Sequence, residues 1–178
     1  MKLRIGIIGC GGIATGKHLS ALKSNGDLCE VVAFCDGILD RAKKAAQEYG
    51  VENAQVCQNY NELLANPNVD VVYVLTPNIS HSPIAVDAFH AGKHVMCEKP
   101  MAINTAEAEK MMTAWKESGK KFLSDTRIVI VRMSVISAAR ARMVIWVRYT
   151  MRKHMQFAEG EFRPGEVLYR EVSRVVDR

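Results

Sequence analysis

Two kinds of hydrophobic pattern alternate along the first 123 residues. Short apolar runs, such as LRIGII at 3–8 and CEVVAFC at 29–35, are closed by Gly or Asp and are typical of buried strands. Between them, apolar residues recur at helical spacing until Gly or Asn ends the segment. These patterns predict strands at 3–8, 29–35, 55–57, 69–75, 94–97 and from 120, and helices from the first glycines to 25 and at 39–49, 59–65, 82–90 and 104–117.

This alternation of strands and helices, with short connections, predicts the fold class. Parallel strands need helical crossovers of this kind, and such crossovers are right-handed. We therefore predict a doubly wound α/β domain with a parallel sheet, a Rossmann domain, over residues 1–123.

The net charge of +5 changes this picture only in the tail. Residues 1–123 hold 13 basic and 13 acidic residues, so the whole excess falls on residues 124–178. Basic residue usage changes at the same point, from 11 Lys and two Arg to one Lys and ten Arg. Scattered Arg among Val and Met has no helical or strand period, which argues against a nucleic-acid-binding arm.

Cysteine spacing and hydropathy exclude other classes. The five Cys form no CxxC pair and have no His at zinc spacing, so we expect reduced thiols and no metal. No uninterrupted apolar stretch approaches the length of a membrane span, and the apolar run before Cys10 is too short for a signal peptide. We expect a cytoplasmic protein without membrane or nucleic-acid partners.

The first predicted turn, GCGGIA at residues 9–14, has the spacing of a dinucleotide fingerprint. Gly9 permits a tight turn, Gly11 lets the backbone approach a pyrophosphate, and Ala14 allows close packing of helix on strand. The free N–H groups near Gly12 and Ile13 would face the anion at the positive end of a helix. The strand and helix predicted on either side favour dinucleotide binding over a plain turn.

Asp36 ends the second predicted strand, about 20 residues beyond the glycines, where an acid accepts hydrogen bonds from an adenosine ribose. A carboxylate there repels a 2′-phosphate and no Arg follows immediately, so NAD is favoured over NADP. Two alternatives stay open at this point: Asp36 merely caps the next helix, or the site binds S-adenosylmethionine, because methyltransferases also place an acid here.

Polar residues also follow the fourth and fifth strands, at the edge where a parallel sheet binds ligands. Thr76, Asn78 and His81 offer donors and acceptors for ribose and carboxamide, although turn and cap roles are equally compatible. Glu98 and Lys99 emerge from the fifth strand before Pro100, whose peptide bond is a candidate for the cis form. Taken alone, this triplet is compatible with a surface ion pair.

Together, the motifs GCGGIATGKH, VVAFCD, VLTPNISH and HVMCEKPMAINTAEAEKM resemble the N-terminal half of the Gfo/Idh/MocA oxidoreductases, over residues 1 to about 122. The resemblance implies hydride transfer between NAD and a hydroxyl of a sugar, cyclitol or related small molecule, with a homo-oligomeric full-length form. It implies that Lys99 assists catalysis. It also implies that the nucleotide contacts are Gly9, Gly11, Gly12, Asp36, Thr76, Asn78 and Glu98.

The tail departs from this family, which continues with a segment like IGYQNR and an α/β substrate domain. Codons that encode residues 124–131, read one base earlier, can spell IGYQNRYR. We therefore hypothesise that residues 124–178 are an out-of-frame tail in place of the substrate domain. Such a truncated chain is expected to bind NAD weakly at best and to have no turnover. A non-catalytic NAD sensor and a methyltransferase are the alternatives.

Overall fold

A computed structural model describes residues 2–124 of the chain. The out-of-frame hypothesis therefore concerns residues that, except for Ser124, lie outside the described residues. Within residues 2–124 the predicted α/β architecture is confirmed. Parallel strands form one six-stranded sheet in the order β3-β2-β1-β4-β5-β6. The strands are β1 (Leu3–Ile8), β2 (Cys29–Cys35), β3 (Gln55–Cys57), β4 (Val71–Val74), β5 (His94–Cys97) and β6 (Phe122–Ser124).

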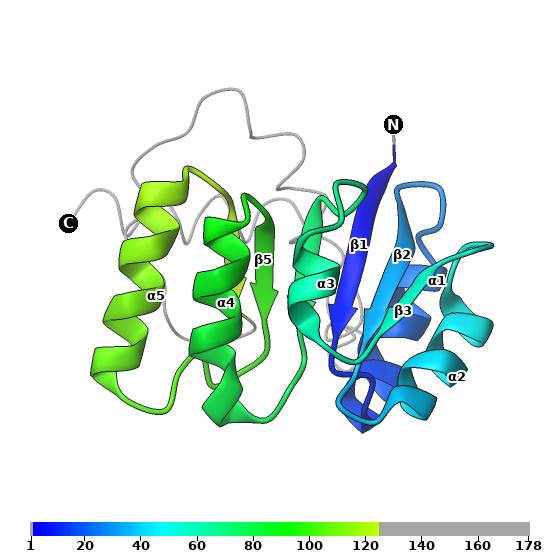
Figure 1. Cartoon of the computed structure of the whole chain (residues 1–178), viewed down its shortest axis with the longest axis horizontal. Coiled ribbons are helices and arrows are strands. Elements are labelled where there is room, and N and C mark those ends of the chain that lie inside the picture. The colour runs from blue at the N-terminus through cyan, green and yellow to red at the C-terminus, as the bar shows by residue number, and fades with distance from the viewer. Residues whose placement is uncertain (1, 125–178) are drawn as a thin grey trace, which may run out of the picture. The chain divides into compact units, whose positions relative to one another are not determined.

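Helices connect successive strands. In Figure 1, α3, α4 and α5 lie in front of the sheet and α1 lies behind it, as right-handed crossovers on the two sides of β1 require. The α-helices are α1 (Ser20–Lys23), α2 (Leu39–Tyr49), α3 (Tyr60–Leu64), α4 (His81–His90) and α5 (Thr105–Ser118). Asn104 caps α5 by accepting the N–H of Glu107, as its sequence position predicts.

Two helical segments differ from the prediction. Residues Ala14–Leu19 (η1) form a π-helix that leads into α1, and Asn78–Ser80 (η2) form a short 3-10 turn before α4. π-Helical turns are rare and are found frequently at functional sites. Both segments directly follow a strand, at the edge where the sequence places the ligand.

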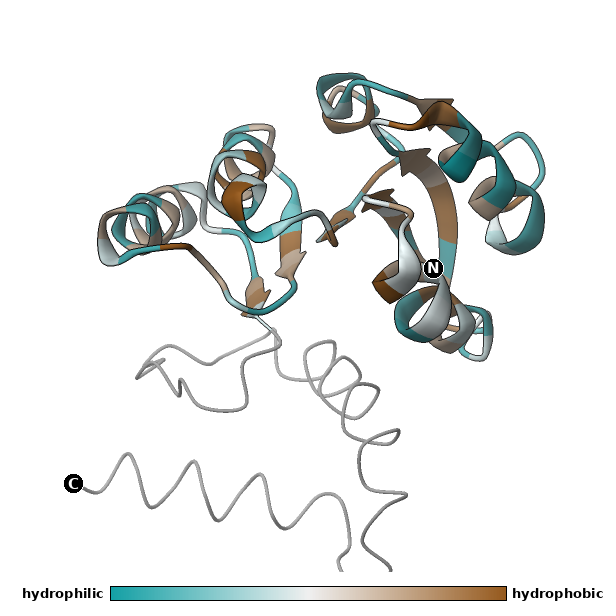
Figure 2. Cartoon of the chain, turned by 90° about the horizontal axis from the view of Figure 1, so that it is seen from below, coloured by the Kyte–Doolittle hydropathy of each residue, from teal (hydrophilic) through white to brown (hydrophobic). Residues whose placement is uncertain are grey.

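The core is built from strands that are apolar on both faces, and Figure 2 shows these strands as the most hydrophobic part of the described chain. All four residues of β4 are buried. On one face, the buried side chains of α4 and α5, including Phe89 and Met111, pack against the sheet. On the same face, Phe89 meets Phe122 of β6 edge to face, with 5.6 Å between ring centroids. The central strands are thereby fixed, and with them the loops at their ends.

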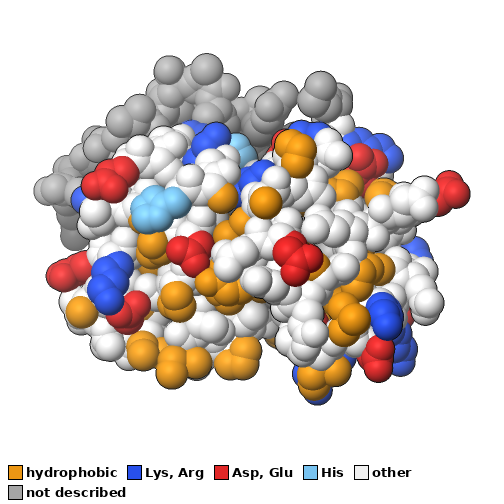
Figure 3. Space-filling model, in the orientation of Figure 1, with side chains coloured by type: hydrophobic (Ala, Val, Ile, Leu, Met, Phe, Trp, Pro, Cys, Tyr) orange, Lys and Arg blue, Asp and Glu red, His pale blue; other side chains and the backbone are white. Residues whose placement is uncertain are grey.

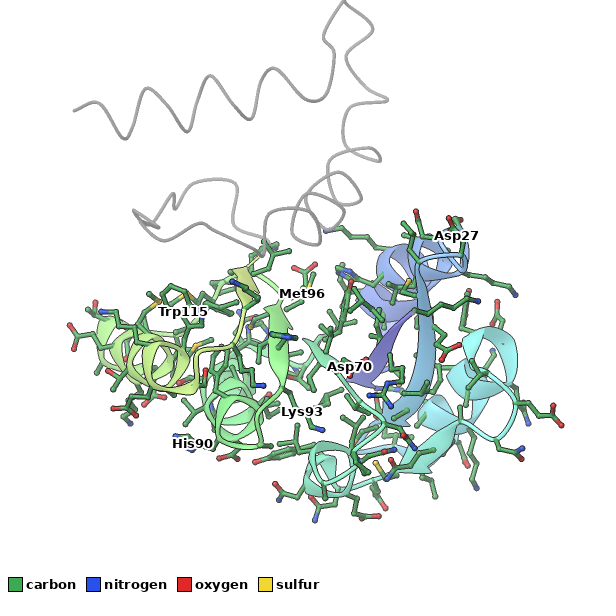
Figure 4. All side chains as sticks on the ribbon, turned by 90° about the horizontal axis from the view of Figure 1, so that it is seen from above. Asp27, Asp70, His90, Lys93, Met96 and Trp115 are labelled. Atoms are coloured by element: carbon green, nitrogen blue, oxygen red, sulfur yellow. The ribbon has the colours of Figure 1, made fainter. Side chains whose placement is uncertain are left out.

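Hydrogen bonds from charged residues stabilise the edge of the sheet formed by the amino ends of the strands, which faces the viewer in Figure 4. Arg4 donates to both carboxylate oxygens of Asp70, at 3.0 and 2.7 Å, and so joins β1 to the start of β4. The ammonium of Lys93 donates to the carbonyl oxygens of Asn66 and Val69 at 2.7 and 2.9 Å. These bonds secure the edge opposite the one that carries the candidate site.

Candidate functional site

The glycine turn lies between β1 and η1, at the point where the strand order reverses. Gly9 has a φ of 95°, and a Cβ there would lie 2.7 Å from the carbonyl oxygen of Leu75. Gly9 is therefore required by both its conformation and the close approach of the β4 exit. A Cβ at Gly11 or Gly12 would meet nothing within 4 Å, so the turn borders open space. Such a turn at a helix N-terminus fits a diphosphate.

Asp36 lies beside this turn and shapes it. One carboxylate oxygen accepts the N–H of Cys10 at 2.8 Å, and the other accepts the N–H of Ile38 at 2.8 Å. Asp36 is not the N-cap residue of α2, which is Ile38, but its bond to the Ile38 N–H supports the start of that helix as well as the turn. The carboxylate is half-buried, and each oxygen retains capacity to accept a further hydrogen bond from a ligand hydroxyl.

An open cleft of about 540 Å³ runs from the glycine turn along α2. Gly11, Gly12 and Thr15 line one side, and Arg41 and Lys44 line the other. Both cations are exposed, and within residues 2–124 neither side chain has a hydrogen bond or ion pair. The sequence does not mark this pair as part of a site, because charged residues on an exposed helix face are ordinarily solvated.

The β4 exit carries Thr76, Asn78 and His81. Asn78 is exposed, and the hydroxyl of Thr76 accepts a hydrogen bond from Ser80 at 2.9 Å. His81 is only 1% exposed, and its ring nitrogens lie 2.8 Å from the carbonyl oxygens of Pro100 and Thr76. Both ring nitrogens are already within hydrogen-bond distance of protein carbonyl oxygens. The geometry therefore favours a role for His81 in joining two loops over direct contact with a ligand.

The β5 exit brings the candidate catalytic residue to the same edge. Lys99 is exposed, and its Nζ makes no hydrogen bond or ion pair within the described part of the chain. The Lys99–Pro100 peptide bond is cis. Glu98, by contrast, is 5% exposed and directed inward, where it accepts the N–H of Lys99 at 2.9 Å. The two residues therefore have different environments despite being adjacent.

Lys17 and His18 complete the arrangement, although neither was predicted as a site residue from the sequence. His18 Nε2 lies 2.8 Å from Glu98 Oε1, and Lys17 Nζ lies 3.3 Å from the same oxygen. Burial acts to raise the pKa of Glu98, but the bonds from His18 and the Lys99 N–H, with the charge of Lys17, outweigh it and hold the pKa below its ordinary value.

Apolar side chains are exposed along this carboxyl edge, which is the lower edge in Figure 1 and Figure 3. Isolated exposed apolar residues are common, but these four each follow a different strand of the sheet. They are Ile13, Ile38, Ile79 and Ile103, from 42% to 72% exposed. The edge therefore offers apolar surface beside its polar groups, a composition typical of small-molecule sites.

The remaining chemistry-bearing residues do not add a second site. The five cysteines are free and buried, as expected for reduced thiols. Burial, together with the Asp36 carboxylate, raises the pKa of the Cys10 thiol to about 12. Within residues 2–124, no group of three His, Cys, Asp or Glu side chains is arranged to hold a metal. None of the helices in that part of the chain is long and apolar enough to cross a membrane.

The strand order, the glycine turn at the reversal point and the acid at the end of β2 define a dinucleotide-binding Rossmann domain. The chain belongs to the Gfo/Idh/MocA oxidoreductases: the model of this family, an NAD-binding Rossmann fold, matches residues 3–126. Family and relatives are NAD(P)-dependent oxidoreductases, which confirms the predicted class.

Relatives of known activity share this domain. Inositol 2-dehydrogenase of Salmonella typhimurium is 36% identical over 123 residues, which cover 69% of this chain and 36% of the relative. D-glucoside 3-dehydrogenase of Escherichia coli is 39% identical over 123 residues, 69% of this chain and 34% of the relative. The chain thus spans about a third of the length of these relatives.

Solved structures agree with this assignment. The 3-ketoreductase KijD10 of Actinomadura kijaniata, in complex with NADP, has a TM-score of 0.65 and 33% identity, with 70% of this chain and 39% of that chain covered. The WlbA dehydrogenase of Bordetella pertussis, in complex with NADH and UDP-GlcNAcA, has a TM-score of 0.65 and 31% identity, with 70% and 37% covered. These two relatives bind different dinucleotides.

Proposed function

We propose that residues 2–124 are the dinucleotide-binding half of an oxidoreductase that transfers a hydride between NAD and a hydroxyl of a sugar, cyclitol or related small molecule. The observation that carries this proposal is the shared edge of the sheet. The glycine turn and Asp36 lie at the ends of β1 and β2, and Lys99 lies at the end of β5. A dinucleotide that spans the reversal point extends from the first group of residues to the last.

The residues fit their roles chemically. Open space beside Gly11 and Gly12 admits the diphosphate, and the backbone amides at the start of the helix, near Gly12 and Ile13, would hold it. Bound NAD supplies the hydride acceptor at its nicotinamide ring. The exposed amine of Lys99, when neutral, accepts the proton of the substrate hydroxyl at Nζ as the carbon–hydrogen bond breaks. The alcohol becomes a carbonyl, and the proton is held by the lysine.

We infer that NAD is preferred over NADP. The Asp36 carboxylate repels a phosphate on the adenosine 2′-oxygen, whereas it accepts hydrogen bonds from a free ribose. Arg41 and Lys44 act in the opposite sense, because they bring unpaired positive charge to the same cleft. We assign the preference to Asp36 because it is bonded directly to the turn, whereas both cations are exposed on α2.

Replacement of Asp36 by Asn tests this inference. We expect the ratio of NADPH to NADH affinity to rise about 100-fold, since the variant removes like-charge repulsion and leaves both cations in place. Asp40→Asn is the control: it removes an exposed acid of α2, the helix that carries both cations, and should leave the ratio unchanged. Calorimetric titration with both dinucleotides measures the ratio. An unchanged ratio in Asp36→Asn would assign cofactor choice to other groups.

We propose further that the tail from about residue 124 is out of frame. Supporting this, the family match ends at residue 126, and the relatives share about a third of their length with the chain. The change from Lys to Arg usage falls at the same point. The coding DNA across codons 120–126 decides the matter. If no single-base change there opens a frame for a substrate domain, this part of the proposal fails.

The catalytic proposal is tested on the repaired, full-length chain. Polyols and sugars are screened for substrate-dependent NADH formation, and Lys99→Met is compared with Lys110→Met, which changes an exposed lysine of α5. We expect Lys99→Met to lower turnover about 100-fold or more, the contribution of a general base, and Lys110→Met to have no effect. Full turnover in Lys99→Met would remove Lys99 from the mechanism.

A further inference from the structure

Glu98 is a buried carboxylate with three donors from two distant parts of the chain. Its Oε1 lies 2.8 Å from His18 Nε2 and 3.3 Å from Lys17 Nζ, and its Oε2 accepts the backbone N–H of Lys99 at 2.9 Å. His18 and Glu98 are 80 positions apart in sequence. The carboxylate therefore joins η1, which follows the glycine turn, to the backbone of the exposed lysine.

His18 is buried and its ring contacts a residue of β4. It is 3% exposed, and its ring meets the Tyr73 ring of β4 edge to face, with 5.8 Å between centroids. The π-helical segment places His18 and Leu19, two consecutive residues, on the buried side. A buried ionised carboxylate is costly unless it is fully hydrogen-bonded, so loss of the His18 bond would free Glu98 to move.

We propose that His18 is a positioning residue for Lys99: through Glu98 it fixes the course of the chain at the β5 exit relative to the glycine turn. The proposal rests on the function proposed above. It assigns to His18 and Glu98 a role in holding the nicotinamide half of the site, although neither side chain is directed at the solvent-exposed edge. Lys17 contributes the third donor and a positive charge beside the carboxylate.

The two halves of the dinucleotide allow this role to be separated from simple support of the fold. ADP has the adenosine and diphosphate that the glycine turn and Asp36 would hold, but it has no nicotinamide half. NADH has both. If His18 only shaped η1, its loss would weaken ADP and NADH binding equally. If His18 positions the β5 exit, NADH alone is affected.

The experiment uses the whole 178-residue chain and titrates it with NADH and with ADP by calorimetry. His18→Leu replaces the imidazole with an apolar side chain of similar size and so removes the hydrogen-bond donor. His18→Gln instead supplies an amide donor at a similar distance from Glu98. His90→Leu, at the exposed end of α4, is the matched control. We expect His18→Leu to lose about tenfold or more in NADH affinity with ADP affinity unchanged, since hydrogen bonds to a charged group are among the stronger ones in proteins. We expect His18→Gln to restore most of the NADH affinity.

A second readout reports on Lys99 directly. The lysines are reductively methylated with ¹³C and the Lys99 signal is assigned with Lys99→Arg. NADH should move this signal in the original chain and in His18→Gln, and not in His18→Leu. Should His18→Leu fail to fold, Glu98→Gln, which keeps the shape and removes the charge, is expected to show the same selective loss of NADH affinity.

The outcomes separate the two proposals. Parallel losses of ADP and NADH affinity in His18→Leu, or no loss of either, would overturn the positioning role while leaving dinucleotide binding intact. Failure of both the original chain and the repaired, full-length chain to bind NADH and ADP would instead overturn the proposed function itself.

Discussion

Gly11→Ala is expected to lower NADH affinity at least 30-fold, about 2 kcal/mol, without lowering the stability of the fold. A Cβ at Gly11 meets nothing within 4 Å in the protein, so the folded chain accommodates it. The same Cβ enters the space through which the backbone must approach a diphosphate. Calorimetric titration measures the affinity, and unfolding in guanidinium measures the stability.

Gly26→Ala is the matched control for this change. It adds the same methyl group at the end of the first helical segment, 3.4 Å from the carbonyl oxygen of Lys23 and away from the residues of the cleft. Its NADH affinity should equal that of the original chain. If Gly11→Ala also bound NADH with full affinity, the glycine turn would not be the diphosphate site.

Gly9→Ala is expected to act on the fold rather than on the ligand, and to lower the free energy of unfolding by about 3 kcal/mol. Its backbone has a positive φ of 95°, which strains any side chain. Its Cβ would lie 2.7 Å from the carbonyl oxygen and 2.8 Å from the carbonyl carbon of Leu75, which are backbone atoms that cannot rotate away.

The guanidinium midpoint measures this loss, again against Gly26→Ala. A stable domain loses a large part of its stability in such a change, because the total is only about 5–15 kcal/mol. NADH binding should fall with the folded fraction. An unchanged midpoint in Gly9→Ala would show that the turn relaxes easily and that glycine is not required there.

Local signals predicted most of the fold because several elements end at a stop residue in their own sequence. The strand at 29–35 and the helix at 39–49 have the predicted bounds, the latter ended by Gly50. The expected strand at 69–75 is shorter in the structure, Val71–Val74, since the N–H of Val69 turns back to Asn66. The π-helical winding of Ala14–Leu19 has no signal in a hydrophobic period.

Candidate site residues could be proposed from the sequence only where one segment carries the whole signal. The glycine turn and Asp36 follow from spacing alone, and the structure brings Asp36 onto the N–H of Cys10. The His18–Glu98 pair depends on two segments that meet only in the folded sheet, and His18 by itself fits an ordinary apolar helix face. Pairs of this kind can be recognised only once the tertiary structure is known.

The central claim is that the backbone amides of the glycine turn hold the diphosphate of a dinucleotide. Amide NMR of the ¹⁵N-labelled chain during titration with NADH tests it most directly. We predict that the signals of Gly11, Gly12 and Ile13 shift as NADH binds, while those of Lys93 and His94 at the opposite edge of the sheet do not. Saturable binding with shifts confined to the opposite edge, or no response of the turn at millimolar NADH, would contradict it.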